Sequence, residues 1–223
     1  MMADSMAQAR FNMVEQQIRP WEIFDPKVLG LLEEMPRERF VPEAYQHLAY
    51  ADIEIPIGHG QAMMHPRMEA KILQALDLQP TDRVLEVGTG SGFLTACLAH
   101  LAGQVVSIDI HEDFTETAAT HLQALNIRNS VLRTGDALAG PLEADGPFDA
   151  IAVTGSLPSN QQADIFRGQL KPGGRLFVIV GNSPVMQALL ITRMAGGGFR
   201  EEVIVETDLT PLENSALPPV FEF

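Results

Sequence analysis

Short apolar runs alternate with amphipathic stretches through most of the chain. Apolar runs that predict buried strands lie at 84–87, 105–109, 130–133, 148–154 and 175–180. The segments between them carry apolar residues at helical spacing, including a predicted helix at 161–170. Alternation of this kind builds a parallel sheet with helices on both faces. We therefore expect an α/β fold with a doubly wound, mostly parallel sheet.

The two ends of the chain depart from this alternation. Apolar residues at helical spacing predict an N-terminal helical appendage formed by helices at 7–17 and 27–35. Residues 50–61 place Ile53, Ile55 and Ile57 in alternation before two glycines, which predicts a short strand entering a loop. A helix is expected from Arg67 to Leu78. At the other end, two extended runs at 188–193 and 201–207 flank three glycines, and we expect an antiparallel hairpin there.

A glycine-rich turn follows the first predicted strand of the alternating region. The sequence VLEVGTGSGF places Glu86 in the strand and Gly88, Gly90 and Gly92 in the turn that opens a helix. Glycines let the backbone amides approach a ligand closely. The spacing is GxGxG, whereas dinucleotide-binding turns use GxGxxG. Together with the bulky Phe93, this spacing favours the amino-acid end of S-adenosylmethionine over a pyrophosphate.

Acidic residues lie at or just beyond the next two strand ends. Asp109 ends the run VVSID, where a carboxylate can accept hydrogen bonds from both ribose hydroxyls. Asp136 follows the strand at 130–133, where it can accept from an adenine amino group. Each could instead be a helix cap or turn residue. Taken together with the glycine turn, the three positions are typical of a class I (Rossmann-like) methyltransferase.

The composition of the chain bears on its domain number, its partners and its location. The 223 residues fit one domain, or one domain with an appendage, and carry a net charge of −14. This charge disfavours a nucleic-acid partner, and PRERF at 36–40 is interpreted as a solvated helix end. The single cysteine, Cys97, is expected to be a buried packing residue. With no long apolar stretch and no leader sequence, we expect a cytoplasmic protein without a membrane partner.

Seven segments of the chain resemble the protein-L-isoaspartate O-methyltransferase family from about Met13 to Thr210. Three are specific to the family: MVEQQI (13–18), PRERFVP (36–42) and AYADIEIPIGHGQ (49–61). Four recur in many methyltransferases: VLEVGTGSGF (84–93), TGDAL (134–138), FDAIAVTGS (148–156) and QLKPGGRLFVIVG (169–181).

The resemblance implies methyl transfer from S-adenosylmethionine to the free carboxylate of isoaspartyl residues in damaged peptides or proteins. The acceptor partner is then a peptide or protein carboxylate, and the enzyme is expected to be a monomer or a small homo-oligomer. Residues 1–66 would supply the helices and an acceptor or lid loop, and 67–223 the cofactor-binding domain. The expected cofactor-binding residues are Glu86, Gly88, Thr89, Gly90, Gly92, Asp109, Ile110, Asp136 and Ala137.

The chain departs from the family at its acceptor loop. After Gln61 the family usually has a Thr-Ile-Ser run, whereas this chain has Ala62-Met63-Met64, so both hydroxyls are absent and Met64 stands at the serine position. The candidate catalytic residues are Met64, His65 as the nearest polar replacement, and Ser156, which follows the predicted strand at 148–154. A loop position before Pro66 accounts for His65 more simply, and Ser156 could equally be a cap or turn residue.

No metal site is expected from the motifs. His59 and His65 are six positions apart, without a nearby cysteine or acidic pair, and neither HExxH nor CxxC occurs. Three other functions stay open: a methyltransferase with a changed small-molecule or protein acceptor, a binder of S-adenosylmethionine without catalysis, and, least favoured by the glycine spacing, an NAD oxidoreductase.

Overall fold

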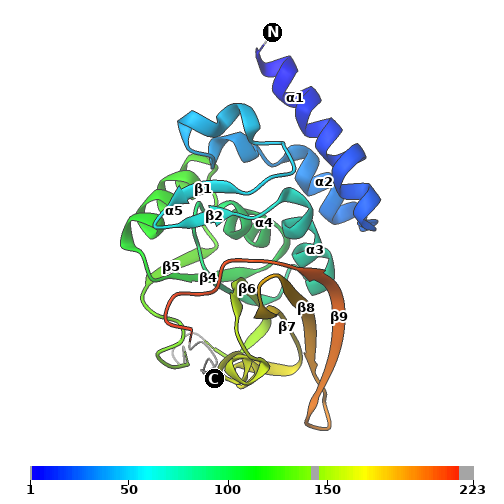
Figure 1. Ribbon diagram of the computed structural model, residues 1–223, viewed down its shortest axis with the longest axis vertical. Helices are drawn as coiled ribbons and strands as arrows, with labels where there is room; N and C mark the ends of the chain where they lie inside the picture. Colours follow the sequence, from blue (N-terminus) through cyan, green and yellow to red (C-terminus); the bar gives the residue numbers. More distant parts are fainter. Residues whose placement is uncertain (1, 142–145, 216–223) are drawn as a thin grey trace, which may run out of the picture.

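The computed structural model describes residues 2–141 and 146–215, and its centre is a seven-stranded sheet (Figure 1). The strand order is β5-β4-β3-β6-β7-β8-β9. Neighbouring strands from β5 to β7 are parallel, and β8 and β9 are antiparallel. The sheet strands are β3 (Arg83–Val87), β4 (Gln104–Asp109), β5 (Ser130–Thr134), β6 (Phe148–Leu157), β7 (Leu170–Asn182), β8 (Val185–Arg193) and β9 (Phe199–Thr207). The predicted mostly parallel sheet with an antiparallel C-terminal hairpin is confirmed.

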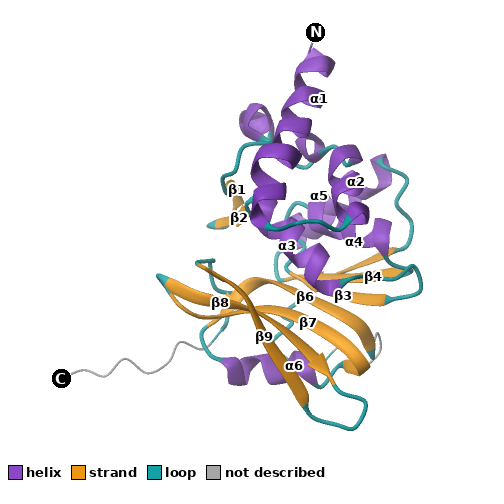
Figure 2. Cartoon of the chain, turned by 90° about the vertical axis from the view of Figure 1, so that its right-hand side faces the viewer, coloured by secondary structure: helices purple, strands orange, loops and turns teal. Residues whose placement is uncertain are grey.

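Helices lie on both sides of this sheet (Figure 2). One side carries α3 (Pro66–Leu76), α4 (Phe93–Leu101) and α5 (Glu112–Ala124), and the short α6 (Asp164–Arg167) lies on the other. The N-terminal appendage consists of α1 (Met2–Met13), which continues as a π-helix at Val14–Ile18, and α2 (Pro26–Glu34). Short 3₁₀ helices occupy Arg19–Trp21, Arg37–Arg39, Glu43–Leu48 and Asn160–Ala163.

Alternation of side chains along the strands builds a core on each face of the sheet. In β3, Val84 packs with the N-terminal helices, α3 and α4, whereas Leu85 and Val87 pack on the opposite face with Phe166 of α6. The first core also includes Met13 and Ile18 of the appendage. The appendage is therefore packed against the sheet domain through a shared apolar core, which supplies much of the driving force for folding.

The β1–β2 hairpin lies apart from the main sheet. It consists of β1 (Ile55–Gly58) and β2 (Gln61–Met63), paired antiparallel. The predicted short strand is present but begins only at Ile55, so Ile53 lies outside it and is exposed while Ile55 is buried. The turn glycines and His59, with φ of 50°, let the chain reverse immediately after β1.

Two other elements differ from the sequence-based prediction. The expected helix at 161–170 is only a 3₁₀ turn followed by the four-residue α6, and β7 begins already at Leu170. β6 extends through Leu157 because Ser156 and Leu157 pair with Ile179 and Val180 after an irregularity in register. Within the described residues, no helix is long and apolar enough to cross a membrane.

Candidate active site

The site lies where the strand order reverses, at the carboxyl ends of β3, β4 and β6. Strands β4 and β6 flank β3 on opposite sides, so their connections leave a crevice there, the usual ligand position in open α/β sheets. The glycine turn fills the base of this crevice. A Cβ on Gly88 would lie 2.1 Å from Oγ1 of Thr154, and one on Gly92 would lie 2.8 Å from Cβ of Ala118. Both positions therefore require glycine.

Thr154 of β6 holds the glycine turn, a role that the sequence did not reveal. Its hydroxyl donates to the carbonyl oxygens of Val87 and Gly88 at 2.8 and 2.9 Å. Thr154 also lines a cavity of about 100 Å³ with Gly88, Gly90 and Asp109. The turn and the cavity wall are thus fixed by the same side chain.

Glu86 is a fully buried carboxyl group with one unpartnered oxygen. Oε2 accepts hydrogen bonds from the hydroxyls of Thr95 and Ser107, the latter at 2.6 Å, whereas Oε1 has no partner among the described residues. Burial raises the pKa of Glu86 to about 8. Glu86 also lines a cavity of about 50 Å³ next to the glycine turn. Once ionised, a buried acceptor of this kind fits the ammonium group at the amino-acid end of S-adenosylmethionine, and the positive charge of that group favours the ionised form.

Asp109 and Ile110 both line the 100 Å³ cavity. Oδ2 of Asp109 accepts from the backbone N–H of Gly90 at 2.8 Å, and Oδ1 accepts from that of His111 at 3.0 Å. These contacts orient the carboxylate and tie the ends of β3 and β4 together. Carboxylate oxygens accept more than one hydrogen bond each, so acceptor capacity is left for ribose hydroxyls.

Asp136 has both carboxylate oxygens bonded to protein groups. One accepts from the backbone N–H of Leu138 at 2.8 Å, as in a turn, and the other from the Asn214 amide at 3.0 Å. Ala137 is buried in the core on the α6 side of the sheet. A contact between Asp136 and an adenine amino group would have to add to or replace the Asn214 contact.

Met64 lies between two cavities and is almost completely buried. It lines the 50 Å³ cavity with Glu86 and also a cavity of about 340 Å³ with His65 and Arg67. The larger cavity is further lined by Trp21, Glu54, Met68, Glu206, Thr207, Asp208 and Leu209. Met64 therefore forms a wall between the cofactor side and a space large enough for part of a peptide.

A buried ion pair supports this wall. Arg37 and Glu69 form a direct ion pair, and Nη2 of Arg37 donates to the carbonyl oxygen of Met64 at 2.8 Å. Burial raises the pKa of Glu69, and the positive charge of Arg37 opposes this shift. The interpretation of PRERF as a solvated helix end is wrong for Arg37, which is fully buried. The sequence carried no signal for it, because its partner lies 32 positions away.

His65 and Ser156 occupy different environments. Nδ1 of His65 lies 3.4 Å from Oδ1 of Asp52, and its side chain lines the 340 Å³ cavity. Ser156 does not follow a strand as expected: it lies within β6 and is fully buried. Its hydroxyl donates to the carbonyl oxygen of Leu209 at 2.7 Å, and Leu209 lines the same cavity as His65. The hydroxyl of Ser156 is therefore engaged in holding that segment.

A further cavity, of about 630 Å³, lies between α5 and the start of β5. Its lining, which includes Leu122, Asn126 and Ser130, contains none of the predicted site residues. Although it is larger, we locate the active site at the glycine turn, where the strand ends and their acidic side chains meet.

Comparisons with known proteins agree with this geometry. The family model for protein-L-isoaspartate (D-aspartate) O-methyltransferase matches residues 8–215. A protein-L-isoaspartate O-methyltransferase of Aliivibrio fischeri is 41% identical over 93% of this chain and 97% of its own length. One from an Anaeromyxobacter species is 44% identical over 85% of this chain and 87% of its own.

The fold is shared with a solved structure. A Plasmodium falciparum protein assigned as a protein-L-isoaspartate O-methyltransferase, crystallised with S-adenosyl-L-homocysteine, superposes with a TM-score of 0.78. The sequences are 21% identical, and the match covers 92% of this chain and 98% of that one. From the match of the family model and the identity to its curated members, the chain belongs to the protein-L-isoaspartate (D-aspartate) O-methyltransferase family.

Proposed function

We propose that this protein uses S-adenosylmethionine to methylate the free carboxylate of isoaspartyl residues in peptides and proteins. The observation that carries the proposal is the position of Met64 between the cavity that contains Glu86 and the 340 Å³ cavity. A methyl donor on one side and a peptide carboxylate on the other would meet at this residue. Family membership supplies the class of acceptor.

The proposed cofactor contacts follow from the charges of the cavity. The bound cofactor supplies an electrophilic methyl group on a sulfonium centre. The carboxylate of Asp109 would accept the ribose hydroxyls, and Oε1 of Glu86 would accept from the ammonium group. Thr89, Gly90, Gly92 and Ile110 would complete this site, with Asp136 and Ala137 near the adenine.

The acceptor chemistry needs little from the protein besides positioning. A carboxyl group with an ordinary pKa of about 4 is ionised at neutral pH, so no general base is required. Holding an anionic nucleophile in line with the methyl group can lower the barrier by several kcal/mol, up to about 7–11. We propose that His65 holds the acceptor carboxylate in line by donating a hydrogen bond to it. The apolar side chain of Met64 would exclude water from the reacting atoms. Ser156 would act as a positioning residue through Leu209.

The rim of the 340 Å³ cavity would select acceptors by charge. Three carboxylates line it, from Glu54, Glu206 and Asp208, beside the cationic Arg67, which is itself paired with Asp52. The excess of negative charge favours peptides with basic residues next to the isoaspartyl position.

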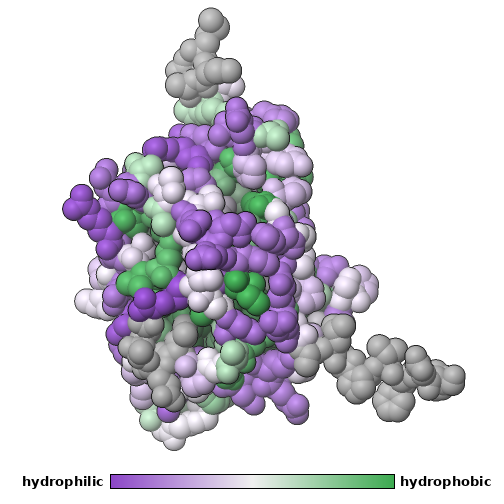
Figure 3. Space-filling model, turned by 90° about the vertical axis from the view of Figure 1, so that its left-hand side faces the viewer, coloured by the Kyte–Doolittle hydropathy of each residue, from purple (hydrophilic) through white to green (hydrophobic). Residues whose placement is uncertain are grey.

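We propose that 1–66 supply the N-terminal helices and the acceptor or lid loop, and that 67–223 form the cofactor-binding domain. Residues from both parts line both cavities. The net charge of −14 argues against a nucleic-acid partner. We propose a monomer or a small homo-oligomer. On the one face shown in Figure 3, apolar patches are small and separated by hydrophilic side chains. The buried free thiol of Cys97 is consistent with a cytoplasmic location.

One observation favours a second candidate function. The apolar side chain of Met64 replaces the hydroxyl that the family usually presents, so a methyltransferase with a changed small-molecule or protein acceptor is the alternative. Mass spectrometry after incubation with S-adenosylmethionine distinguishes the two. An isoaspartyl peptide should gain the mass of one methyl group while its aspartyl twin stays unchanged; methylation of neither peptide would contradict the proposal.

A further inference from the structure

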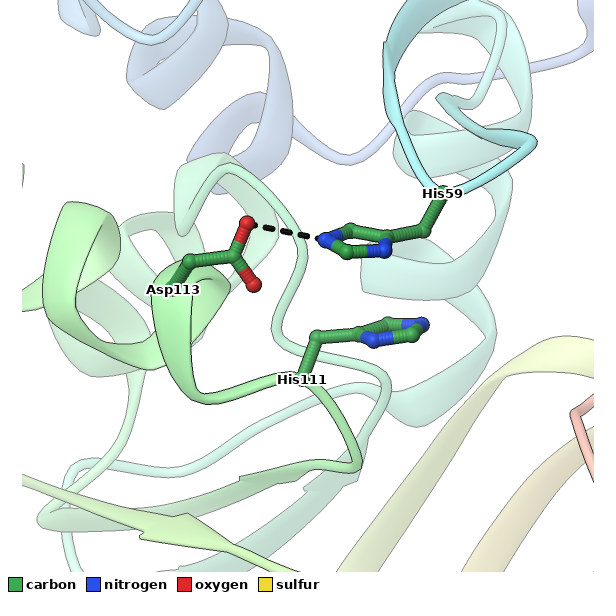
Figure 4. Close-up of side chains that lie close together, drawn as sticks. All are labelled: His59, His111 and Asp113. Atoms are coloured by element: carbon green, nitrogen blue, oxygen red, sulfur yellow. Dashed lines mark hydrogen bonds and ion pairs between the residues drawn. The ribbon is translucent and has the colours of Figure 1, made fainter.

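Three potential metal ligands from two distant segments meet beside the cofactor cavity (Figure 4). They are His59, in the turn between β1 and β2, and His111 and Asp113, which follow β4. One ligand atom from each lies within 4.8 Å of the other two. We propose that these side chains bind a divalent transition-metal cation of the Zn²⁺ type, which fastens the β1–β2 hairpin over the cofactor. Imidazole nitrogen and carboxylate oxygen are suitable ligands for such a cation.

Packing among the side chains holds the ligands close together without a cation. Nε2 of His59 lies 2.9 Å from Oδ2 of Asp113. The rings of His59 and His111 are stacked, with centroids 3.9 Å apart and planes 13° apart. The ring of Phe114 contacts both imidazoles edge-on, at centroid distances of 5.2 and 5.3 Å. The lone pairs of two stacked rings lie in separate, nearly parallel planes, so at least one imidazole ring has to rotate before both histidines can bind one cation.

A neighbouring carboxylate sets the tautomer of His111. Nε2 of His111 lies 2.6 Å from Oε1 of Glu213. An ionised carboxylate only accepts hydrogen bonds, so Nε2 carries the hydrogen and Nδ1 keeps a lone pair for the metal. Metal-bound histidines usually have such a partner, which fixes the ring and strengthens it as a ligand. Glu213 is thus a supporting residue rather than one of the three ligands.

Binding requires that one hydrogen move. In the metal-free state, Nε2 of His59 donates its hydrogen to the carboxylate of Asp113, because an ionised carboxylate only accepts. When the cation binds Nε2, this hydrogen is displaced, and the metal-bound ring carries its single hydrogen on Nδ1. The His59 and Asp113 side chains are 42% and 63% exposed, so a hydrated cation can reach them. The net charge of −14 favours its approach.

The site joins the two walls of the cofactor cavity. The β1–β2 hairpin contributes Ile57, Gln61 and Ala62 to the 100 Å³ cavity, and His111 lines the same cavity next to Asp109. A cation held by both segments would restrict opening of the hairpin. We therefore expect bound cation to slow release of the cofactor product, S-adenosylhomocysteine.

Calorimetric titration of the tag-free full-length protein with ZnCl₂ tests the site, and absorbance of Co²⁺ reports its ligand geometry. His59→Gln and Asp113→Asn should each weaken Zn²⁺ binding by at least about tenfold, and Glu213→Gln by about 10–100-fold. His100→Gln, which changes an exposed histidine on α4, should leave the affinity unchanged. Absence of binding by the folded wild type, or an equal loss in His59→Gln and His100→Gln, would overturn the proposal.

The dissociation rate of S-adenosylhomocysteine tests whether the cation fastens the β1–β2 hairpin, and its measurement requires no methyl transfer. The dissociation rate of S-adenosylhomocysteine should fall severalfold when Zn²⁺ is added to the wild type and should not change in His59→Gln. The urea midpoint of each variant, measured without metal, should equal that of the wild type, which shows that the substitution has not unfolded the protein. A wild-type dissociation rate that does not respond to Zn²⁺ would contradict the fastening of the hairpin.

Discussion

Nη2 of Arg37 donates a hydrogen bond of 2.8 Å to the carbonyl oxygen of Met64, which links a buried ion pair to the wall between the two cavities. Both side chains of the pair, Arg37 and Glu69, are almost completely buried. The cost of removing two charges from water offsets much of the attraction in a buried ion pair, so such a pair is weak evidence for stabilisation of the fold. The geometric role of this pair is clearer, because the guanidinium group of Arg37 fixes the backbone position of Met64.

Removing one partner of this pair should be costly. Arg37→Met leaves the Glu69 carboxylate buried without its counter-charge and should lower the free energy of unfolding by about 3–5 kcal/mol. The double variant Arg37→Met/Glu69→Met should recover most of that loss, since neither charge is then stranded. Urea denaturation measures both. Arg39→Met, in the same 3₁₀ helix, is the matched control, and an equal effect there would contradict the account.

Glu86 should impose a pH dependence on stability. Its pKa is raised to about 8 in the folded protein, so the folded state holds a proton that the unfolded state releases near its ordinary value of 4.5. The stabilisation is fully present below the unfolded pKa and is lost as pH rises through about 8. Glu86→Gln should abolish this part of the slope between pH 5 and 9 in urea denaturation. Identical slopes in variant and wild type would exclude a titrating Glu86.

Asp109→Asn should weaken binding of S-adenosylhomocysteine. Replacing a charged acceptor at the ribose contact is expected to cost about 1.5–3 kcal/mol, or roughly tenfold to a hundredfold in affinity. Calorimetry provides the measurement. Asp77→Asn, at the exposed C-terminal end of α3 with a left-handed φ that asparagine tolerates, is the matched control and should bind normally. Unchanged affinity in Asp109→Asn would remove the ribose assignment.

Met64→Ser should raise activity on isoaspartyl peptides. A hydroxyl that bonds the acceptor would contribute about 1 kcal/mol, or about fivefold in kcat/KM. The same change removes a buried apolar side chain and should lower the free energy of unfolding by a few kcal/mol. Met64→Leu keeps the apolar character, so it should neither raise kcat/KM nor lower the free energy of unfolding by a comparable amount. If serine and leucine give the same kcat/KM, the missing hydroxyl does not limit turnover.

The negative charge of the acceptor cavity should make KM depend on the charge of the residues next to the isoaspartyl position. Isoaspartyl peptides with lysine neighbours should have a lower KM than the same peptides with glutamate neighbours, because Glu54, Glu206 and Asp208 line the cavity. Added salt should reduce the difference, since exposed charges are screened. A steady-state comparison at low and high ionic strength checks this. A preference for the glutamate peptides would place the acceptor elsewhere.

Local sequence signals predicted the strand and the glycine turn at this end of the sheet well. The strand at 84–87, the glycines after it and Asp109 lie within about 25 positions of one another and follow general rules for α/β turns. Gly88 and Gly92 turn out to be required by close contacts with Thr154 and Ala118. The helix at 161–170 was predicted too long because strand pairing of Leu170 with Phe148 overrides its weak helical pattern.

The acceptor side depends on contacts between distant segments, which no local pattern encodes. Arg37 is buried by a partner 32 positions away, and the hydroxyl of Ser156 is engaged by a carbonyl 53 positions away. Sequence spacing places His59 near His65, whereas the fold brings His59 to Asp113, 54 positions along the chain. Side chains that meet only after the hairpin has packed on the sheet could not be paired from spacing.

The arrangement of donor and acceptor around Met64 can be observed in a crystal structure of the protein with S-adenosylhomocysteine and an isoaspartyl peptide. We expect the cofactor to contact Glu86 and Asp109, and the peptide to occupy the 340 Å³ cavity with its isoaspartyl carboxylate beside Met64. A peptide bound at another surface, with Met64 away from the sulfur of the cofactor, would contradict this arrangement.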